Sequence, residues 1–355
     1  MPLPRSTTGH DPIIIDGSYG EGGGQVLRTS LSLAALCGRP TELVNVRAGR
    51  KKPGLAPQHL MCARAVRAIT HGTLEGAQLR SQRLRIVPDR VTPGAYDFDI
   101  GADHPSAGST SLLFQALLPA LLLAHGRSRL GLRGGTHVPW SPPFQYLQHV
   151  FLPALAAMGA RVRAEMEAAG WYPRGQGQVD FDIAPASALS PIEWTDRGQL
   201  VNARCISAAS NLPDHVVRRQ YAAAAKRLAD EGVRVEGELL SLPSVGQGTV
   251  CFVALEFQRG FAGFTSLGRR GKPAEKVGGE AADQAVEFLR GEACVDRHLG
   301  DQIVLYLALA EGQSRLTVEE VTTHLTTNIW AVQNYLDVPI RLDGDVGRPG
   351  AVSVG

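Results

Sequence analysis

One order of secondary structure recurs along this chain and restricts its fold more than any single motif does. Residues 13–37 read as a strand and a helix, 42–70 as a second strand and helix, and 74–87 as two more strands. Residues 96–183 repeat that order, and 294–355 fit a third copy as helix, strand, helix and two short strands. The pattern predicts an α/β (α+β) protein whose large domain holds three repeated units, each a four-stranded sheet with two helices.

Residues 184–291 interrupt this order. They follow a turn-prone stretch rich in proline and serine, and they read as strand, long helix, two strands and a second helix. This alternation predicts a small α/β domain inserted into the larger one. We therefore expect a flexible N-terminal tail over 1–11, repeats 1 and 2 over 12–185, the inserted domain over 186–292 and repeat 3 over 293–355.

Composition excludes several classes of protein. The chain is 44% hydrophobic and 20% charged, as in soluble globular proteins, and no apolar stretch is long enough to span a bilayer. The first twelve residues lack the apolar core of a signal peptide. Five cysteines without Cys-x-x-Cys spacing fit reduced thiols rather than zinc ligands, so we expect a cytoplasmic protein. Because the net charge is only +2, any polyanion must meet a local patch.

A glycine-rich turn follows the first predicted strand. It reads Gly20-Glu21-Gly22-Gly23-Gly24-Gln25 and leads into a helix. Glycines allow close approach of a ligand to the backbone, and a helix N-terminus favours phosphate. Glu21 beside a phosphate calls for a divalent cation between them. The turn therefore indicates a nucleotide phosphate with a metal, or alternatively only tight packing.

Four cationic side chains lie within six residues at the end of the second predicted strand: Arg47, Arg50, Lys51 and Lys52. Such runs are commonly solvated surface. Here they stand at a strand end next to the presumed phosphate loop, where α/β folds place ligand sites, and arginine suits bidentate phosphate contact.

Two further clusters involve histidine. His298 and Asp301 lie one turn apart on a predicted helix. His324 stands among threonines before a helix predicted over 328–336, where a neutral imidazole can be held in one tautomer and attack phosphorus. A lone histidine is also compatible with a purely structural role.

Taken in order and spacing, these motifs resemble the RNA 3′-terminal phosphate cyclase family over about residues 12–342. The resemblance rests on Asp16-Gly17, Gly20-Glu21-Gly22-Gly23-Gly24-Gln25, Arg28, Arg47-Ala48-Gly49-Arg50, Pro53-Gly54-Leu55, Gln58-His59-Leu60, Gly134-Gly135-Thr136, Tyr172-Pro173, Asp301-Gln302, His324-Leu325 and Thr327-Asn328-Ile329. It implies three repeated units with a small inserted domain, in agreement with the pattern above.

The resemblance also implies an activity: ATP-dependent conversion of an RNA 3′-phosphate to a 2′,3′-cyclic phosphodiester through a covalent histidine–AMP and an RNA-adenylate. His324 would be the nucleophile and Glu21 the ligand of Mg²⁺ or Mn²⁺. Arg28, Arg47 and Arg50 would neutralise phosphates of ATP or RNA and the charge that develops during transfer, and Gln58 would position a phosphate or a metal-bound water. The ATP site would comprise Gln115, Pro142, His298, Asp301 and Gln302. RNA with a 3′-phosphate and ATP are the implied partners, without a membrane, and oligomerisation is left open.

The chain departs from the family pattern in places. His298 stands where the family usually has a Tyr or Phe that stacks on adenine, and Gly175-Gln176-Gly177 replaces three glycines. Gln145 receives no role. Two alternatives compete: a cyclase-like protein of RNA processing or ribosome assembly that makes no AMP-enzyme, which would lack His324, and an enolpyruvyl transferase, which needs six repeats and no insert.

Overall fold

Three four-stranded sheets share one strand order in the computed structural model, which describes residues 11–355. In each sheet the first two strands pair in parallel, and the fourth strand lies antiparallel between the second and the third. The fold expected from the recurring pattern is therefore confirmed. Residues 1–10 of the expected N-terminal tail lie outside the described part of the chain.

The first two units follow the predicted order closely. Unit 1 comprises β1 (Ile13–Asp16), α1 (Gly24–Cys37), β2 (Thr41–Val44), α2 (Pro57–Thr70), β3 (Thr73–Glu75) and β4 (Leu84–Val87). Unit 2 comprises β5 (Ala95–Asp99), α3 (Thr110–Leu122), β6 (Ser128–Gly134), α4 (Phe144–Tyr146), a π-helical turn (Leu147–Phe151), α5 (Leu152–Ala157), β7 (Arg161–Ala168) and β8 (Gly177–Ala184).

The third unit takes its strands from both sides of the insertion. It comprises β9 (Glu193–Trp194), α8 (Arg297–Leu309), β14 (Ser314–Val318), α9 (Thr323–Gln333), β15 (Ile340–Asp343) and β16 (Gly350–Val354). Trp194 of β9 pairs in parallel with Leu316 of β14. The short strand β9 thus lies within residues 186–292, the range expected for the inserted domain, and supplies the strand that was missing from the predicted third copy.

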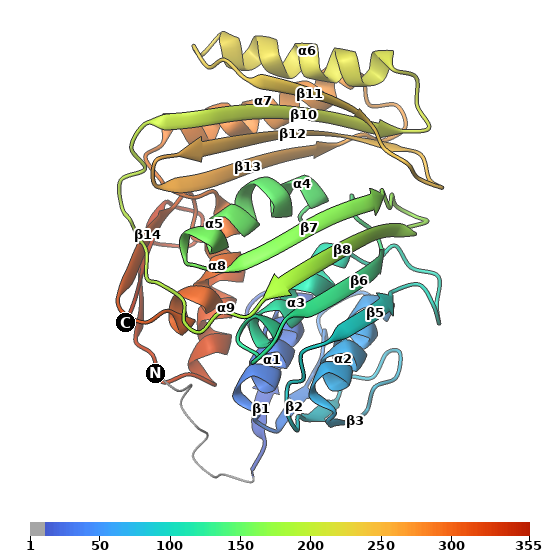
Figure 1. Cartoon of the computed structure of the whole chain (residues 1–355), viewed down its shortest axis with the longest axis vertical. Helices are drawn as coiled ribbons and strands as arrows, with labels where there is room; N and C mark the ends of the chain where they lie inside the picture. Colours follow the sequence, from blue (N-terminus) through green and yellow to red (C-terminus); the bar gives the residue numbers. More distant parts are fainter. Residues whose placement is uncertain (1–10) are drawn as a thin grey trace.

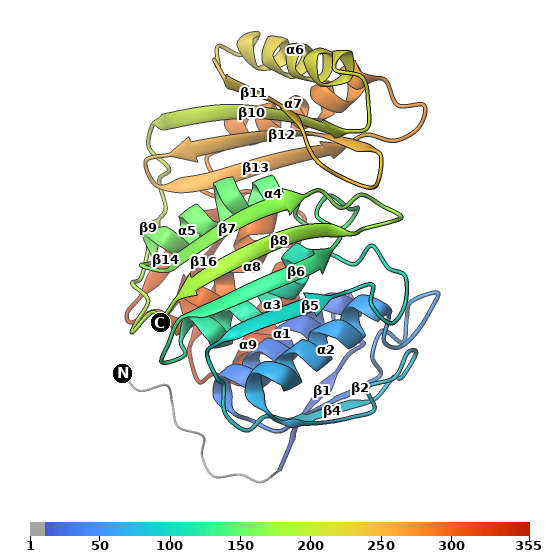
Figure 2. The same cartoon turned by 45° about the vertical axis from the view of Figure 1, so that its right-hand side comes forward.

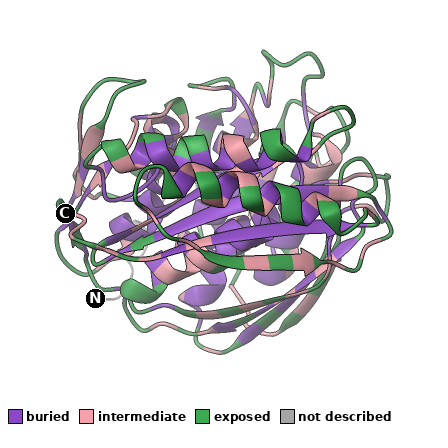
Figure 3. Cartoon of the chain, turned by 90° about the horizontal axis from the view of Figure 1, so that it is seen from above, coloured by how far each residue is buried: buried purple, intermediate pink, exposed green. Residues whose placement is uncertain are grey.

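The intervening segment forms a sheet of its own, at the top of Figure 1. It comprises β10 (Leu200–Ser210), α6 (His215–Ala229), β11 (Glu236–Ser241), β12 (Gly248–Phe257), β13 (Gly260–Leu267) and α7 (Ala274–Arg290). Its strand order, β11-β10-β12-β13, differs from that of the three units because the first strand is internal. Seen from above, the upper helices of this layer carry many exposed residues, and largely buried strands lie beneath them (Figure 3). This layer has its own hydrophobic core.

Helices of the three units pack together beside the sheets. Helix α1 packs against α2, α3 and α9, and α8 packs against α9. Figures 1 and 2 both show α1, α2 and α9 in the part of the molecule below β7 and β8. One hydrophobic core runs through all three units, with Leu27 and Leu31 of α1 fully buried in it. This packing brings several helix N-termini to one place, where the candidate site lies.

Candidate active site

The glycine-rich loop between β1 and α1 lies along the N-terminal part of α9. Gly20 and Gly22 have φ values of 60° and 58°, a conformation that glycine adopts without strain. A Cβ on Gly20 would lie 2.2 Å from Oγ1 of Thr327, so a larger residue would push the loop away from α9. One residue further along the loop, Oε2 of Glu21 lies 3.4 Å from Nδ1 of His324. The loop and α9 thus bring these two predicted site residues together.

Helix α9 begins earlier than the predicted helix, which started at Asn328. Its first residue is Thr323, and Oγ1 of Thr322 caps it by accepting a backbone N–H at 3.0 Å. Threonine has low helix propensity, which is why this stretch reads as a loop. In the structure Oγ1 of Thr327 donates to the carbonyl of Thr323 at 2.6 Å, which satisfies the hydroxyl inside the helix. His324 is therefore fixed in the first turn of a helix.

The surroundings of His324 favour the neutral form of its imidazole. Burial and the nearby positive charge of Arg28, with smaller effects of His298 and Arg50, lower the pKa of His324 below its usual value. Its Nδ1 atom is buried and makes no hydrogen bond within residues 11–355. A neutral imidazole keeps a lone pair for attack on an electrophile.

Arg50 reaches across to the glycine-rich loop. Its guanidinium forms an ion pair with Oε1 of Glu21 and donates to the Glu21 carbonyl at 3.3 Å. A Cβ on Gly23 would lie 2.7 Å from Nη2 of Arg50, so the missing side chain makes room for the guanidinium. The cation predicted to meet phosphate therefore lies beside the carboxylate predicted to meet metal.

A hydrogen-bond network joins α1 to α9. Nη2 of Arg28 donates to Oε1 of Gln25 at 2.7 Å, and Nε2 of Gln25 donates to Oδ1 of Asn328 at 3.1 Å. Oγ1 of Thr29 also donates to that oxygen, at 2.7 Å, while Nδ2 of Asn328 donates to the carbonyl of Asp301 at 2.7 Å. Asn328 therefore links α1, α8 and α9. Asn328 belongs to one of the motifs on which the family resemblance rests, but the sequence analysis assigned no role to it.

Two of the predicted arginines have no anionic partner. Neither Arg28 nor Arg47 forms an ion pair within the described residues; Nη1 of Arg47 donates instead to the carbonyl of Gly54 at 2.7 Å. Burial lowers the pKa of both guanidinium groups. A partly buried cation without a counter-charge favours an anionic ligand.

Gln58 and His59 begin helix α2 next to this loop. Oε1 of Gln58 accepts from the backbone N–H of Ser109 at 3.2 Å, and its Nε2 is buried without a partner in the described chain. His59 lies beneath Gly24, where a Cβ would come within 2.3 Å of its Nε2. Burial and the charges of Arg28 and Arg47 lower the pKa of His59 to about 3, so it is neutral. His59 therefore packs beside two cations without adding charge.

The residues predicted for ATP come from α3, α8 and the loop before α4. Nε2 of Gln115 donates to Oε1 of Gln302 at 2.5 Å, which joins α3 to α8. His298 lies in the first turn of α8. Pro142 lies in the loop before α4, without a hydrogen bond or ion pair to the other predicted ATP residues.

Asp296 holds the start of α8 in place. Its carboxylate caps the helix by accepting from the backbone N–H groups of His298 and Leu299, and it also accepts from the Tyr146 hydroxyl at 2.9 Å. A third contact, from the backbone N–H of Gly263 at 3.0 Å, comes from β13 of the inserted segment. The inserted segment therefore contacts the helix that carries His298, Asp301 and Gln302.

Asp301 lies on α8 close to this cap. Burial, together with repulsion from Asp296, holds the pKa of the Asp301 carboxyl well above its usual range, against the opposing effect of Arg28. The carboxyl of Asp301 therefore favours its protonated form and offers a hydrogen-bond donor.

Gln145, to which the sequence assigned no role, has a structural one. Its Oε1 lies 2.7 Å from Nε2 of His137, whose Nδ1 lies 2.7 Å from Oγ1 of Thr136. His137 also stacks on Trp171, with ring centroids 4.6 Å apart. These buried contacts fix the loop that follows β6.

Two arginines of helix α6, in the inserted segment, are paired with carboxylates. Arg219 forms a bidentate contact with Glu275, and Arg227 contacts Glu231 and Asp283. These contacts tie α6 to α7 and leave those two arginines occupied by carboxylates.

No group of three or more His, Cys, Asp or Glu side chains is placed to hold a metal anywhere in residues 11–355. A single carboxylate such as Glu21 is compatible with a Mg²⁺ site, because Mg²⁺ is commonly held by one or two carboxylates together with substrate phosphates and water. The Glu21 side chain is 30% exposed, so a cation can reach it.

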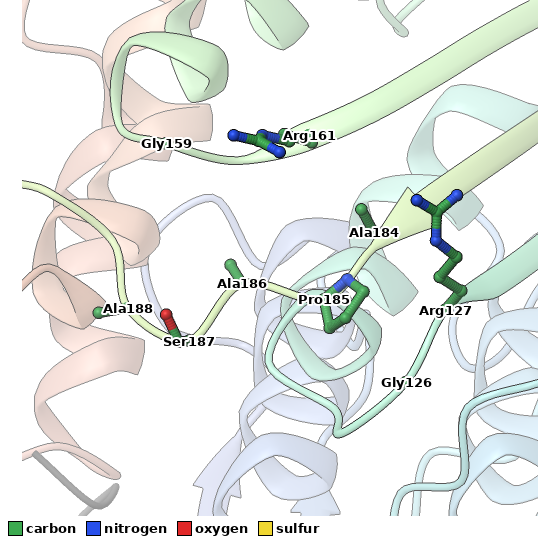
Figure 4. Close-up of a pocket in the computed structure, with 9 residues that line it drawn as sticks. All are labelled: Gly126, Arg127, Gly159, Arg161, Ala184, Pro185, Ala186, Ser187 and Ala188. Carbon is green, nitrogen blue, oxygen red and sulfur yellow. The ribbon is translucent and has the colours of Figure 1, made fainter.

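A cavity of about 560 Å³ lies elsewhere, at the far end of the second sheet. It is lined by Gly126, Arg127, Gly159, Arg161 and residues 184–188 (Figure 4). Because β6 begins at Ser128 and ends at Gly134, the cavity lies at the opposite end of that strand from the loop at His137. It contains none of the predicted site residues.

The family model described as RNA 3′-terminal phosphate cyclase matches residues 19–342. The chain belongs to this family. A protein of Methylococcus capsulatus named RNA 3′-terminal phosphate cyclase is 45% identical to the chain over 325 residues, covering 90% of each. One of the same name from Pyrococcus abyssi is 42% identical over 344 residues, covering 96% of this chain and 98% of that protein. Membership of the cyclase family thus extends over nearly the whole length.

The solved structure of the enolpyruvyl transferase NikO from Streptomyces tendae matches with a TM-score of 0.27 and 12% identity, covering 98% of this chain and 66% of that one. A likeness this slight carries no argument for the transferase alternative. No helix in the described residues is long and apolar enough to cross a membrane.

Proposed function

We propose that this protein converts an RNA 3′-terminal phosphate to a 2′,3′-cyclic phosphodiester at the expense of ATP, releasing AMP and diphosphate, as a ligase that forms a phosphoric ester. The observation that carries the proposal is the position of His324 in the first turn of α9, where Oε2 of Glu21 lies 3.4 Å from its Nδ1 and the charges of Arg28 and Arg50 help to lower its pKa. The names of the relatives, at 42–45% identity, support the same activity.

In the first step, Nε2 of His324 attacks the α-phosphorus of ATP. With its proton on Nδ1, the atom that lies 3.4 Å from Oε2 of Glu21, the imidazole would keep the Nε2 lone pair free for this attack. The N–P bond forms as the bond to diphosphate breaks. Arg28, Arg47 and Arg50 offset the charge that develops on the phosphates. AMP is then carried by His324.

In the second step, an oxygen of the RNA 3′-phosphate attacks the same phosphorus, breaks the N–P bond and forms an RNA-adenylate. In the third step, the neighbouring 2′-hydroxyl attacks the 3′-phosphate, loses its proton and displaces AMP. Nε2 of Gln58, buried and unpaired in the described structure, supports a role in holding one of these phosphates. Mg²⁺ or Mn²⁺ bound at Glu21 would neutralise phosphate charge.

Adenosine would bind at α8, with His298, Gln302, Gln115 and Pro142 as the residues that the family resemblance implies for it. The protonated carboxyl favoured at Asp301 supports donation of a hydrogen bond to the nucleotide. All five cysteines are free thiols, which supports a cytoplasmic setting. The non-catalytic alternative is disfavoured because His324 is present and sits in this charged setting.

Labelling with ATP carrying phosphorus-32 at the α-position tests the proposal. With Mg²⁺ or Mn²⁺, we expect an acid-labile, base-stable label on the wild-type polypeptide and none on His324→Ala. His215→Ala serves as the matched control because it removes an exposed histidine at the start of α6. An RNA with a 3′-phosphate should then become resistant to phosphatase. Cyclic ends formed at the normal rate by His324→Ala would show that another group is the nucleophile.

A further inference from the structure

We propose that Tyr19, stacked on Trp330, is an aromatic platform for the base of the 3′-terminal nucleotide of the RNA. The inference rests on the proposed function and assigns a binding role to side chains outside the machinery described above. The two rings lie 4.0 Å apart between centroids, with an angle of 15° between their planes.

Tyr19 and Trp330 lie along α9 from His324, at a distance that suits one nucleotide. Three consecutive loop residues contact α9 at positions three residues apart: Tyr19 on Trp330, Gly20 on Thr327, and Glu21 on His324. At a rise of 1.5 Å per residue, the six residues from His324 to Trp330 correspond to about 9 Å along the helix. This separation is on the order of the span of one nucleotide. A phosphate at His324 therefore leaves its own base within reach of Tyr19.

Tyr19 is both fixed and accessible. Its backbone N–H donates to the carbonyl of Asp16 at 3.1 Å, and its carbonyl accepts from Gly22 at 3.0 Å, so the turn holds it in place. Trp330 is partly buried and packs on the main hydrophobic core, whereas Tyr19 remains 43% exposed. Trp330 thus backs the tyrosine ring, which still presents surface to solvent.

Stacking on an aromatic ring is the usual way in which proteins hold unpaired bases of single-stranded RNA, and it tolerates any base. Charge complementarity also favours an RNA nucleotide on Tyr19. Arg50 contacts Glu21, two residues after Tyr19, and its guanidinium can bind the phosphate of the same nucleotide. Trp140 and Tyr172 are more exposed, at 98% and 70%, but stack on no other ring in the described chain. Of these three exposed aromatic residues, only Tyr19 stacks on another ring and belongs to the loop that carries Glu21.

The test is a double comparison of protein and RNA. Wild type and Tyr19→Ala are each given a short single-stranded RNA with a 3′-phosphate, carrying either a normal base or an abasic ribose at its last position. Binding is followed by fluorescence anisotropy, and cyclisation by resistance to phosphatase. We expect Tyr19→Ala to weaken binding and raise KM about tenfold for the normal RNA and to have little effect with the abasic RNA.

Two other variants complete the test. Tyr19→Phe keeps the ring and should restore the wild-type values. Val201→Ala, which removes an exposed side chain on β10, should leave both RNAs unaffected.

Four results overturn the inference. Equal losses for both RNAs would mean that Tyr19 contacts no terminal base. An equal rise in the KM for ATP during self-adenylation would place adenine on the ring instead. If the wild-type protein binds RNA but never cyclises it, both the proposed function and the role of Tyr19 are wrong. If Tyr19→Ala cyclises RNA normally at unchanged KM, only the role of Tyr19 is wrong.

Discussion

Oε2 of Glu21 and Nδ1 of His324 lie 3.4 Å apart, although one residue belongs to the first unit and the other to the third. The other oxygen of the same carboxylate is paired with Arg50. One carboxylate, that of Glu21, therefore contacts both Arg50 of unit 1 and His324 of unit 3, the proposed nucleophile.

Replacement of Glu21 by Gln should raise the concentration of Mn²⁺ or Mg²⁺ needed for half-maximal self-adenylation, because a neutral amide binds a hard cation more weakly than a carboxylate. Stability should change by less than about 1 kcal/mol, since the ion pair with Arg50 is partly exposed. A metal titration of labelling by α-labelled ATP provides the measurement. An unchanged titration curve would exclude Glu21 as a ligand.

Replacement of Arg28 by Met should abolish self-adenylation without lowering the urea midpoint of unfolding. In the described chain Arg28 pairs with no carboxylate, so the folded protein loses little when the charge is removed. Arg28→Lys should recover only part of the rate, because lysine keeps the charge and lacks the planar fork. If Arg28→Met unfolds at a much lower urea concentration, the residue serves the fold and not the phosphate.

Replacement of Asn328 by Leu should cost about 2 kcal/mol of stability, because the buried carbonyl of Asp301 and hydroxyl of Thr29 lose their partner. Self-adenylation should slow as well, since Asn328 lies one turn after His324 on α9. Gln333→Ala, at the exposed end of the same helix, is the control. Urea denaturation and initial labelling rates measure the two effects, and a normal rate would show that the network does not position His324.

The pH dependence of self-adenylation should reflect the lowered pKa of His324. Attack requires the neutral imidazole, so the rate should rise with pH through a midpoint below about 6.5, the usual value for histidine, and then level off. Initial labelling rates between pH 4.5 and 8 at saturating ATP and metal measure this midpoint. An acid limb centred above that value would contradict the electrostatic environment described for His324.

Stability itself should fall in mild acid because of His137. Burial lowers the pKa of His137 to about 4, while the unfolded chain has the usual value near 6.5. The unfolded state then binds more protons below that value, so the stability is complete above it and declines as the pH falls toward 4. Between pH 7 and 5 this residue should account for about 2 kcal/mol.

His137→Gln isolates that contribution. Urea unfolding at pH 7 and 5 should show a smaller decline for the variant than for the wild type. Equal declines would mean that His137 is charged in the folded protein.

Local patterns were sufficient to predict the three repeated units, because each helix and most strands carry their own periodicity. They failed where tertiary contact decides the outcome. The two residues of β9 are too few to show a period, and the threonines before Asn328 form helix only because Thr322 caps it. Strand β13 was also missed, between elements that were predicted correctly.

In the candidate site too, the sequence predicted some features and not others. Motif order suggested which residues belong together, and the structure places Glu21, Arg50 and His324 in contact. The supporting network was not predictable, because Asn328 joins Gln25, Thr29 and Asp301 through contacts between segments far apart in the chain. No local pattern encodes such distances.

The position of α9 after the other units has a consequence for synthesis of the protein. The sheets of the first two units and of the inserted segment are complete before residue 300, whereas His324 lies beyond β14. During translation, which proceeds from the N-terminus, a nascent chain acquires Arg28, Arg47 and Arg50 long before it acquires His324. Under the proposed mechanism, a polypeptide that stops short of α9 would therefore be unable to form the histidine–AMP, and self-adenylation would begin only after residue 324 has been added and α9 has folded.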